Sequence, residues 1–259
     1  MLCMTKNLIV HVRPQGVHLT ETVRLAVWNT AGAFHRKADV VQGFAADIAV
    51  LSEVGADCCD HFEGATSCAW IGREGGRGVA IVGFGGWQIE PSGLVVVERL
   101  FLPSVATKGN VTLQVIGVCV QRSGDYVAPT KRALSALSDF IAEAPTIIAG
   151  DFNQTVRLDP GRGPARQFRG VVDQLEALGL RSAWHSFHGD IFGAETAATH
   201  YWRWQKQNEY HIDYAFAPET MRVSSVTLGT YEDYAEPRIS DHVPLLVDVE
   251  VPRDDQDRS

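Results

Sequence analysis

Residues 146–153, with the sequence TIIAGDFN, place an acid and an amide directly behind an apolar run that ends in a glycine. The two isoleucines predict a buried strand, and Gly150 allows the chain to turn where that strand ends. Asp151 and Asn153 then lie at the carboxyl end of the strand, where α/β proteins place their chemistry. If the backbone stays extended, their side chains point the same way. A polar turn would show the same pattern, so the rest of the chain has to distinguish the two interpretations.

Length and composition are those of one large α/β domain. The 259 residues can bury a sizeable core, and 45% hydrophobic with 21% charged residues is ordinary for a soluble globular protein. Without repeats or a long linker, we predict one domain at residues 23–252, an N-terminal extension at 1–22 and a frayed tail at 253–259. The net charge of −8 argues against nonspecific coating of nucleic acid. It does not argue against an enzyme that handles phosphate through a metal ion held by acids.

The cysteine pattern and the absence of long apolar runs bear on the compartment. Five cysteines are an odd number, and no pair has zinc-finger spacing, so a reducing compartment is the simplest interpretation. Nothing resembles a signal peptide, and no apolar run approaches the roughly 20 residues that span a bilayer. The expectation is a cytoplasmic protein, monomeric and without a membrane partner.

Hydrophobic patterns predict alternating strands and helices. Strands are expected at residues 24–29, 48–51, 79–82, 94–100, 111–120, 146–150, 199–204, 210–216, 221–228 and 243–247. Helices are expected at 36–46, 129–143 and 171–178, with Pro129 in a first turn and Gly179 as a C-terminal cap. The segment between 100 and 111 contains Pro103 and Gly109 and is interpreted as a connecting loop.

Polar side chains stand beside several of the predicted strands. Asn29 ends one of them, and Glu53 follows four apolar residues, where a carboxylate is unusual without a partner or a role. Each could be an isolated turn residue. Together they form a set of acids, amides and one histidine: Asn29, Glu53, Asp151, Asn153, Asp213, Asp241 and His242.

This set indicates phosphoester chemistry. Oxygen ligands suit a hard cation such as Mg²⁺ or Mn²⁺. Such an ion usually retains several water ligands and binds the phosphate of the substrate. There is no Walker loop and no nucleophilic Ser or Cys with a clear partner. Hydrolysis needs a metal to neutralise charge, a base to deprotonate water, and cationic or hydrogen-bonding groups to meet charge on phosphorus. The residues of the set can fill these roles.

Two basic segments could contact phosphate. The glycine-dense residues 72–84 carry Arg73 and Arg77, and residues 157–169 carry four arginines, among them Arg162 and Arg166. Both segments could equally be solvated loops. Trp202 could stack on a base, although such aromatics more often fill a sheet interface.

Histidines are also concentrated in the C-terminal half. His185, His188, His200 and His211 could line one pocket, but their spacing fits no zinc signature.

Five short motifs give the sequence a resemblance to the endonuclease/exonuclease/phosphatase superfamily. They are Trp28-Asn29, Ser52-Glu53, Gly150-Asp151-Phe152-Asn153, Ile212-Asp213-Tyr214 and Ser240-Asp241-His242, in the family's order. The resemblance implies an α/β (α+β) fold of the DNase I-like type, a four-layer α/β sandwich of two mixed sheets with helices on the outer faces.

The resemblance also implies roles at a metal centre and at the reacting phosphate. Glu53 would be the main metal ligand, with Asn29 and Asp241 near the ion. Asp151 would align or deprotonate the attacking water.

The remaining motif residues would serve the phosphate. Asn153 would hydrogen-bond it, and His242 would contact one of its oxygens. Asp213 would set the tautomer and orientation of that histidine.

The chain departs from the family pattern at two places. Ala31 stands where the family's nucleases often carry an acid, which favours a single-metal site. The strand that ends near Cys119 commonly delivers a His or Tyr to the phosphate, and here Gln121 or Arg122 could substitute, while Cys119 is better interpreted as core. The candidate substrate-binding residues are Arg77, Gln121, Arg122, Arg162, Arg166 and His200.

The leading hypothesis is therefore a divalent-metal-dependent phosphodiesterase or nuclease acting on DNA or another nucleic acid. The alternative is a phosphatase or phosphodiesterase of a small phosphorylated metabolite or lipid headgroup. A catalytically dead phosphate-binding module is disfavoured, because the complete set of acids and the histidine is present.

Overall fold

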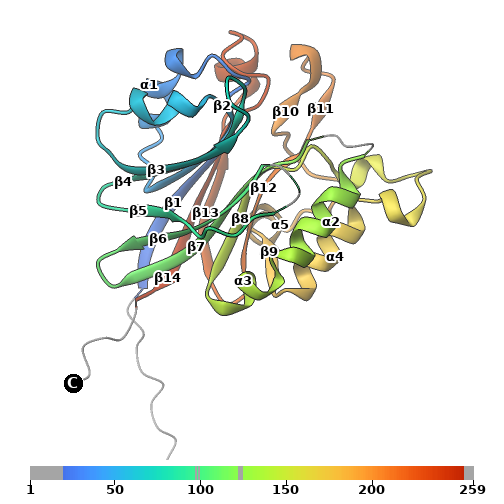
Figure 1. Ribbon diagram of the computed structural model, residues 1–259. Helices are drawn as coiled ribbons and strands as arrows, with labels where there is room; N and C mark the ends of the chain where they lie inside the picture. The colour runs from blue at the N-terminus through green and yellow to red at the C-terminus, as the bar shows by residue number, and fades with distance from the viewer. Residues whose placement is uncertain (1–19, 97, 99, 122–124, 254–259) are drawn as a thin grey trace, which may run out of the picture.

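In the computed structural model, residues 20–96, 98, 100–121 and 125–253 are described, and two β-sheets pack face to face with helices outside them (Figure 1). The strands of sheet 1 lie in the order β13 (Arg222–Leu228), β14 (Leu245–Pro252), β1 (Thr20–Asn29), β2 (Ile48–Val54), β4 (Gly78–Phe84) and β3 (Ala65–Gly72). Those of sheet 2 lie in the order β5 (Gln88–Pro91), β6 (Phe101–Lys108), β7 (Val111–Cys119), β8 (Thr146–Asp151), β12 (Asp213–Pro218) and β9 (Leu180–Ser182). A separate ladder joins β10 (His200–Tyr201) to β11 (Glu209–Tyr210).

Each sheet has one parallel pair at its centre. β1 and β2 run parallel in sheet 1, and β7 and β8 run parallel in sheet 2, while the other neighbours are antiparallel. Both sheets are therefore mixed. Because parallel strands end at the same edge, each sheet delivers two strand ends to one end of the molecule.

Helical segments cover the outer faces of both sheets. Those packed on sheet 1 are η1 (Phe34–Arg36), α1 (Ala38–Gln42), η2 (Ala56–His61) and the π-helical turn η6 (Tyr231–Ala235). Those packed on sheet 2 are α2 (Val127–Ala136), α3 (Ser138–Glu143) and α4 (Arg169–Ala177). The fourth α-helix of the C-terminal half, α5 (Ala183–His188), packs against β12 and β13 at the side of the sandwich. Further short turns are η3 (Val156–Leu158), η4 (Pro164–Arg166) and η5 (Trp202–Trp204).

The expected four-layer α/β sandwich is thus confirmed. The core between the two sheets, called the central layer below, contains their inward-facing apolar side chains. Examples are Val50 and Ile81 from sheet 1 and Val115 and Ile147 from sheet 2. Alternate residues of the same strands face the outer helices, which is the period-two pattern of a strand buried on both sides. No helix among the described residues is long and apolar enough to cross a membrane.

One expected strand is wrong in position. Residues 94–96 have no regular structure, and the strand lies instead at β6, across the segment interpreted as a loop. Pro103 misled that interpretation, because proline cannot donate to a ladder. Pro103 lies at the end of the β5 ladder, one residue beyond Ser104, where its carbonyl oxygen accepts from the backbone N–H of Ser92 at 2.9 Å.

Other boundaries moved in smaller ways. The helix expected at 129–143 is divided into α2 and α3 at Leu137. The strand expected at 199–204 is only two residues long and continues as η5. β1 begins at Thr20, so the expected boundary between extension and domain falls inside a strand. Residues 1–19 and 254–259 lie outside the described part of the chain.

The expectation that Gly150 turns the chain is wrong. Gly150 lies inside β8, which continues to Asp151. Its φ of +140° is unfavourable for a residue with a side chain, and an added Cβ would lie 1.9 Å from the carbonyl oxygen of Val118. The glycine is therefore required by the close approach of β7 to β8.

We expect Gly150→Ala to lower the free energy of unfolding by about 2–4 kcal/mol, because both the backbone angle and the contact with β7 become unfavourable. Urea denaturation would measure it as a lower midpoint. Gly163→Ala is the matched control, since Gly163 has a φ of −64° and open space around its Cα. A loss of stability equal to that of the control would contradict this account.

Candidate active site

The side chain of Asn29 joins the two sheets at the ends of their parallel strands. Asn29 Nδ2 donates to Glu53 Oε1 at 3.3 Å and to Asp151 Oδ2 at 2.9 Å. Its Oδ1 accepts from the backbone N–H of Ala31 at 2.9 Å. Glu53 belongs to sheet 1 and Asp151 to sheet 2, so one buried amide holds together acids from both halves of the sandwich.

Glu53 lies in a β-bulge of β2. The register with β4 shifts between Ser52 and Val54, and Glu53 has a φ of +59°. A non-glycine residue in this region is strained, and such strain is characteristic of functional sites. The bulge turns the Glu53 carboxylate out of the sheet, where it is one-third exposed and pairs with Arg77. Ser52 stays buried and donates to the carbonyl oxygen of Val118 in sheet 2 at 3.1 Å.

Asp151 and Asn153 converge, although the chain between them is not extended. Asn153 has a φ of +53°, so the expected period-two argument does not apply. Instead, Asn153 N and Nδ2 donate to the two oxygens of Asp151 at 2.7 and 2.9 Å. The same Nδ2 donates to Val120 O at 3.1 Å. Burial, with repulsion from Asp213, raises the pKa of Asp151 to about 7.

His242 and Asp213 form a buried pair on the other side of Asp151. His242 Nδ1 is 2.8 Å from Asp213 Oδ2. Burial lowers the pKa of His242, but the carboxylates of Asp213, Asp151 and Asp241 outweigh it and raise this pKa to about 10. The imidazole is therefore held as a cation with Nδ1 committed to Asp213 and Nε2 left for another partner.

The loop that carries Asp241 is bonded to β1. Ser240 Oγ donates to Asn29 O at 2.7 Å and accepts from His242 N at 3.1 Å. His200 Nε2 lies 3.6 Å from Asp241 Oδ2, and its ring centroid is 4.3 Å from that of His242. His200 is thus brought to the site, as expected, by the pairing of β10 with the Asp241 loop.

Lys37 was not singled out from the sequence, yet it lies in the same centre. It is buried and donates Nζ hydrogen bonds to the carbonyl oxygens of Thr30 and Gly32, the latter at 2.7 Å. Burial, together with the nearby charge of Arg77, lowers the pKa of Lys37, although Asp241 and Glu53 oppose this shift. Both acids therefore act on one ammonium group. A lysine in a predicted amphipathic helix gives no local sign of this role.

A cavity of about 480 Å³ opens in front of these groups, lined by Glu53, Arg77, Gly78, Leu100, Cys119, Val120, Gln121, Tyr126 and Asn153. A second cavity of about 420 Å³ shares Arg77, Leu100 and Gln121 with it and continues toward Arg73. Arg77 and Gln121, two of the residues predicted to bind substrate, thus line both cavities. Tyr126 was missed, because no pattern distinguishes it from any aromatic residue that precedes a helix. Arg122 lies outside the described residues.

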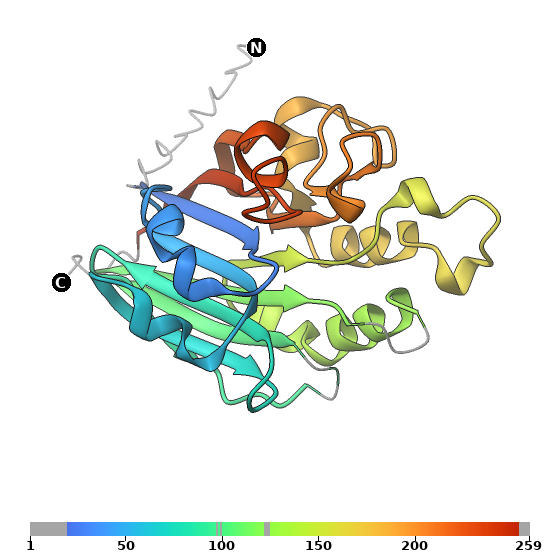
Figure 2. The same cartoon turned by 90° about the horizontal axis from the view of Figure 1, so that it is seen from above.

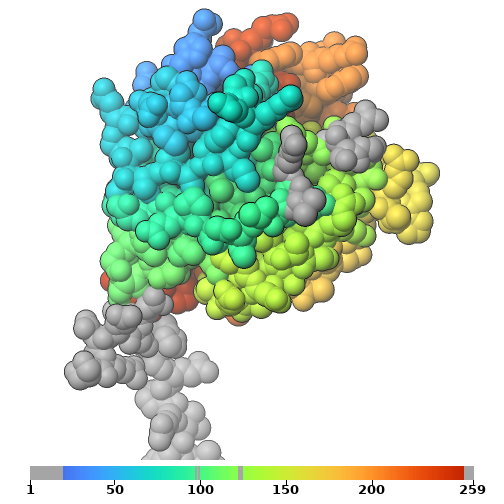
Figure 3. Space-filling view, in the orientation of Figure 1, coloured from blue at the N-terminus to red at the C-terminus, as the bar shows by residue number. Residues whose placement is uncertain are grey.

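The arginine-rich segment projects from the body beside α4 (Figures 2 and 3). Arg162 donates to Gln154 Oε1 at 2.9 Å, next to Asn153, and exposed Arg166 lies 3.9 Å from Asp125. Neither lines the cavities above. The structure places these two arginines at an outer rim rather than at the centre.

The four histidines do not share one pocket. His185 Nδ1 lies 2.8 Å from Ser182 Oγ, and its Nε2 lies 3.3 Å from Glu195, with all three side chains buried. His211 packs beside this group, whereas His200 lies at Asp241. His188 packs on Trp184, so of these four histidines His200 alone reaches the Asp241 site.

The donor set is suitable for a hard divalent cation. Glu53, Asp241 and Asn29 offer oxygen atoms, and such ligands suit Mg²⁺ or Mn²⁺. Of these three residues, Glu53 lines the cavity. The Glu53 carboxylate is already turned out of the sheet and paired with a cation, Arg77. Ala31, where an acid would add a ligand, contributes only its backbone N–H to Asn29. Ala31 therefore adds no side-chain ligand to this set.

Comparison with known proteins agrees with this arrangement. The sequence profile of the Endonuclease/Exonuclease/phosphatase family matches residues 26–242. The chain belongs to this family. Its members are phosphoester hydrolases and generally use divalent metal ions. No curated protein sequence matches the chain.

Solved structures of this family share the fold. An endonuclease/exonuclease/phosphatase from Beutenbergia cavernae has a TM-score of 0.64 at 20% identity, covering 89% of this chain and 72% of that one. The 3' phosphatase NExo from Neisseria, bound to product DNA hairpin, has a TM-score of 0.63 at 20% identity, covering 87% and 98%. Truncated TDP2 from Caenorhabditis elegans has a TM-score of 0.63 at 14% identity, covering 88% and 97%. At these identities the likeness concerns the fold alone.

We expect Asp213→Asn to lower the pKa of His242 from about 10, because the nearest carboxylate charge is removed. The pKa of His242 in the folded protein lies above its ordinary value of 6.5. Protonation of His242 therefore makes its full contribution to the free energy of unfolding below about pH 6.5. The contribution is lost as the pH rises through 10. Imidazole NMR titration of both proteins measures the pKa, and urea unfolding at several pH values measures the stability.

The exposed pair of Arg169 with Asp173 supplies the control, since Asp173→Asn should leave the His242 titration unchanged. An Asp213→Asn protein whose His242 titrates as in the wild type would show that the pair does not hold the charge.

Proposed function

We propose that this protein is a divalent-metal-dependent phosphoester hydrolase, and specifically a phosphodiesterase or nuclease acting on DNA or another nucleic acid. The observation that carries the proposal is the hydrogen-bonded chain from Glu53 through Asn29 to Asp151. It gathers a partly exposed ligand, an orienting amide and a buried acid beside the cavity that Glu53 and Asn153 line. The His242–Asp213 pair adds a cation on the far side of Asp151.

Each group has a role that its surroundings favour. Glu53 and Asp241, with Asn29, would hold the ion, which supplies neutralisation of phosphate charge and support for the leaving oxygen when bound. Asp151 would align and deprotonate the attacking water, and a pKa raised by burial to about 7 suits a general base near neutral pH.

The remaining polar groups would bind the phosphate. Asn153 lines the cavity, and its Nδ2, which here donates to Asp151 and to Val120 O, would exchange one of these acceptors for a phosphate oxygen. Protonated His242 has Nε2 available for another phosphate oxygen. Arg77 lines both cavities and carries the positive charge needed for a second contact. Gln121 and Tyr126 would complete the wall at the strand end where the family commonly delivers a His or Tyr.

Nucleic acid is the preferred substrate class because of the surroundings of the site. Arg162 and Arg166 lie at the outer rim, and Trp202 is 47% exposed with the Arg203 guanidinium 4.3 Å from its ring. Such a cation and aromatic surface suits stacked bases and a phosphate backbone. The DNA-bound NExo structure from Neisseria shows that the fold can accept DNA in a relative.

The alternative is a small phosphorylated metabolite or lipid headgroup. It is favoured by the net charge of −8 and by the two joined cavities, which together are large enough for a compact phosphate ester. A cytoplasmic monomer that needs Mg²⁺, or Mn²⁺ in its place, remains part of the proposal under either substrate class.

A substrate panel separates the two classes. Abasic duplex DNA, single-stranded DNA, RNA, inositol phosphates and sphingomyelin would each be assayed with magnesium and with EDTA. Turnover of oligonucleotides that EDTA abolishes supports the proposal. Turnover confined to inositol phosphates or sphingomyelin would support the alternative.

We expect Glu53→Gln and Asp151→Asn each to lower kcat on a generic bis-phosphodiester by about 10²–10³-fold or more, because each removes a group used in the transition state. Glu53→Gln should also weaken magnesium binding in calorimetry, whereas Asp151→Asn should weaken it less. Glu232→Gln, at an exposed pair with Lys206, is the control. Full turnover in either site variant would remove the assignment of this centre.

We expect the double change Arg162→Gln with Arg166→Gln to raise the KM for an oligonucleotide and to reduce its salt dependence. Each lost phosphate contact should lower the log–log salt slope by about 0.7–0.9. The control is Arg181→Gln with Arg222→Gln, which removes two charges paired elsewhere with Glu219 and Glu250. An unchanged KM and salt slope would show that the rim does not bind the substrate.

A further inference from the structure

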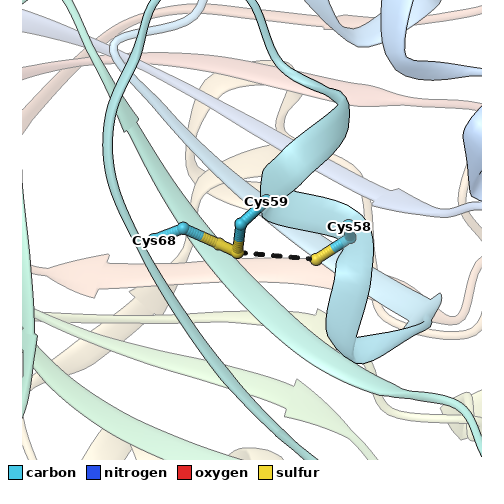
Figure 4. Close-up of side chains that lie close together, drawn as sticks. All are labelled: Cys58, Cys59 and Cys68. Atoms are coloured by element: carbon cyan, nitrogen blue, oxygen red, sulfur yellow. Dashed lines mark hydrogen bonds between the residues drawn. A yellow bond between two sulfur atoms is a disulfide. The ribbon is translucent and has the colours of Figure 1, made fainter. Parts of the chain in front are cut away.

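Three cysteines lie together on the outer side of sheet 1, and the proposed hydrolysis uses none of them. Cys58 and Cys59 are neighbours in η2, and Cys68 lies in β3 (Figure 4). Cys59 and Cys68 form a disulfide, and Cys58 Sγ lies 3.9 Å from Cys59 Sγ. All three sulfur atoms lie within 4.8 Å of one another. The sequence analysis took the odd number of cysteines as a sign of a reducing compartment and did not predict this cluster.

The three sulfur atoms come from two separately fixed segments, η2 and β3. η2 is held by the packing of buried Cys58 and Phe62 in the core of the outer layer. Cys68 is held by the pairing of β3 with β4, where it lies opposite Val82. Cys59 and Cys68 are half-buried, so solvent can reach the cluster at these two residues. The Cys58 side chain is fully buried.

We propose that the reduced form of this cluster binds one thiophilic divalent cation of the zinc class through the sulfur atoms of Cys58, Cys59 and Cys68. Two thiolates at about 2.3 Å from a tetrahedral ion are about 3.8 Å apart. The 3.9 Å between Cys58 and Cys59 has this spacing. Once the bond to Cys59 is broken, Cys68 needs only to move away to the same separation.

The charge around the cluster also favours a cation. Asp57 and Asp60 flank the two cysteines of η2 and act on Cys58 with negative charge. Burial and these acids disfavour an uncompensated thiolate at Cys58, and a divalent ion supplies the missing compensation. Three sulfur ligands leave the fourth tetrahedral position to water.

Reduction must precede binding. A dithiol reductant gives two electrons and two protons to the Cys59–Cys68 bond, which yields two thiols and leaves the reductant as a disulfide. The ion then displaces the thiol protons as the three sulfur–metal bonds form. Oxidation of Cys59 and Cys68 by a disulfide reagent would remove two of the three ligands and release the ion.

This site would be chemically separate from the oxygen site at Glu53. Thiolates prefer soft or borderline ions, whereas carboxylates and amides prefer magnesium and manganese. The two sites would therefore take different metals from a mixture, although η2 begins only three residues after Glu53. The inference does not depend on the proposed hydrolysis.

The test uses the full chain in its reduced and oxidised forms. After reduction by a dithiol and removal of the reductant without oxygen, the protein is titrated with Zn²⁺ by calorimetry and with Cd²⁺ by ultraviolet absorption. We expect one ion per reduced chain with a thiolate-to-metal charge-transfer band, and neither signal in the oxidised chain. Because this comparison needs no substitution, it does not depend on how any variant folds.

Single serine substitutions identify the ligands. Cys58→Ser and Cys68→Ser should each weaken binding at least tenfold, while Cys119→Ser, in β7, removes a thiol outside the cluster and should not. Circular dichroism checks that each variant is folded. A reduced wild-type chain with free thiols that binds no ion would overturn the proposal, as would a Cys58→Ser protein with wild-type affinity.

Discussion

The two hydrogen bonds of the Asn29 amide are the interaction on which the rest of the site depends. Asn29 Nδ2 reaches one carboxylate from each sheet, and the amide is 1% exposed. Hydrogen bonds to charged groups contribute about 1.5–3 kcal/mol each, and a buried acid left without its donor costs a similar amount. The amide therefore holds the buried Asp151 carboxylate and the partly exposed Glu53 carboxylate on one side chain.

The charges around this amide are nearly balanced. The acids are Glu53, Asp151, Asp213 and Asp241, and the cations that face them are Arg77, Lys37 and His242. Buried charges are tolerated only where they are paired and hydrogen-bonded. This set contains four acids and three cations. Its members come from segments between β1 and the loop before β14. An added divalent ion is therefore compatible with the charge of the centre, and its position is constrained by every pair around it.

Much of the central architecture could be predicted from sequence, because its signals are local. The apolar runs that became β2 and β8 are buried on both faces, and the polar residues at their ends were recognisable by contrast. What could not be predicted depends on contacts distant in sequence. Pro103 lies in a strand because β6 pairs with β7 along its length, and the bulge at Glu53 is defined by its register with β4. Lys37 and Tyr126 belong to the centre only because of where the folded chain places them.

The two sheets have the same arrangement of strands, and this explains why the site needs hydrogen bonds between the sheets. Each sheet contributes a parallel pair, and neither pair alone brings together a ligand and a base. Apolar packing in the central layer is nondirectional, so it holds the sheets together without setting their offset to the accuracy that catalysis requires. The directional bonds of Ser52 to Val118 and Asn29 to Asp151 set that offset at the catalytic edge. The site is therefore a property of the interface between the sheets, and the residues that align them are as necessary to it as those that would touch the phosphate.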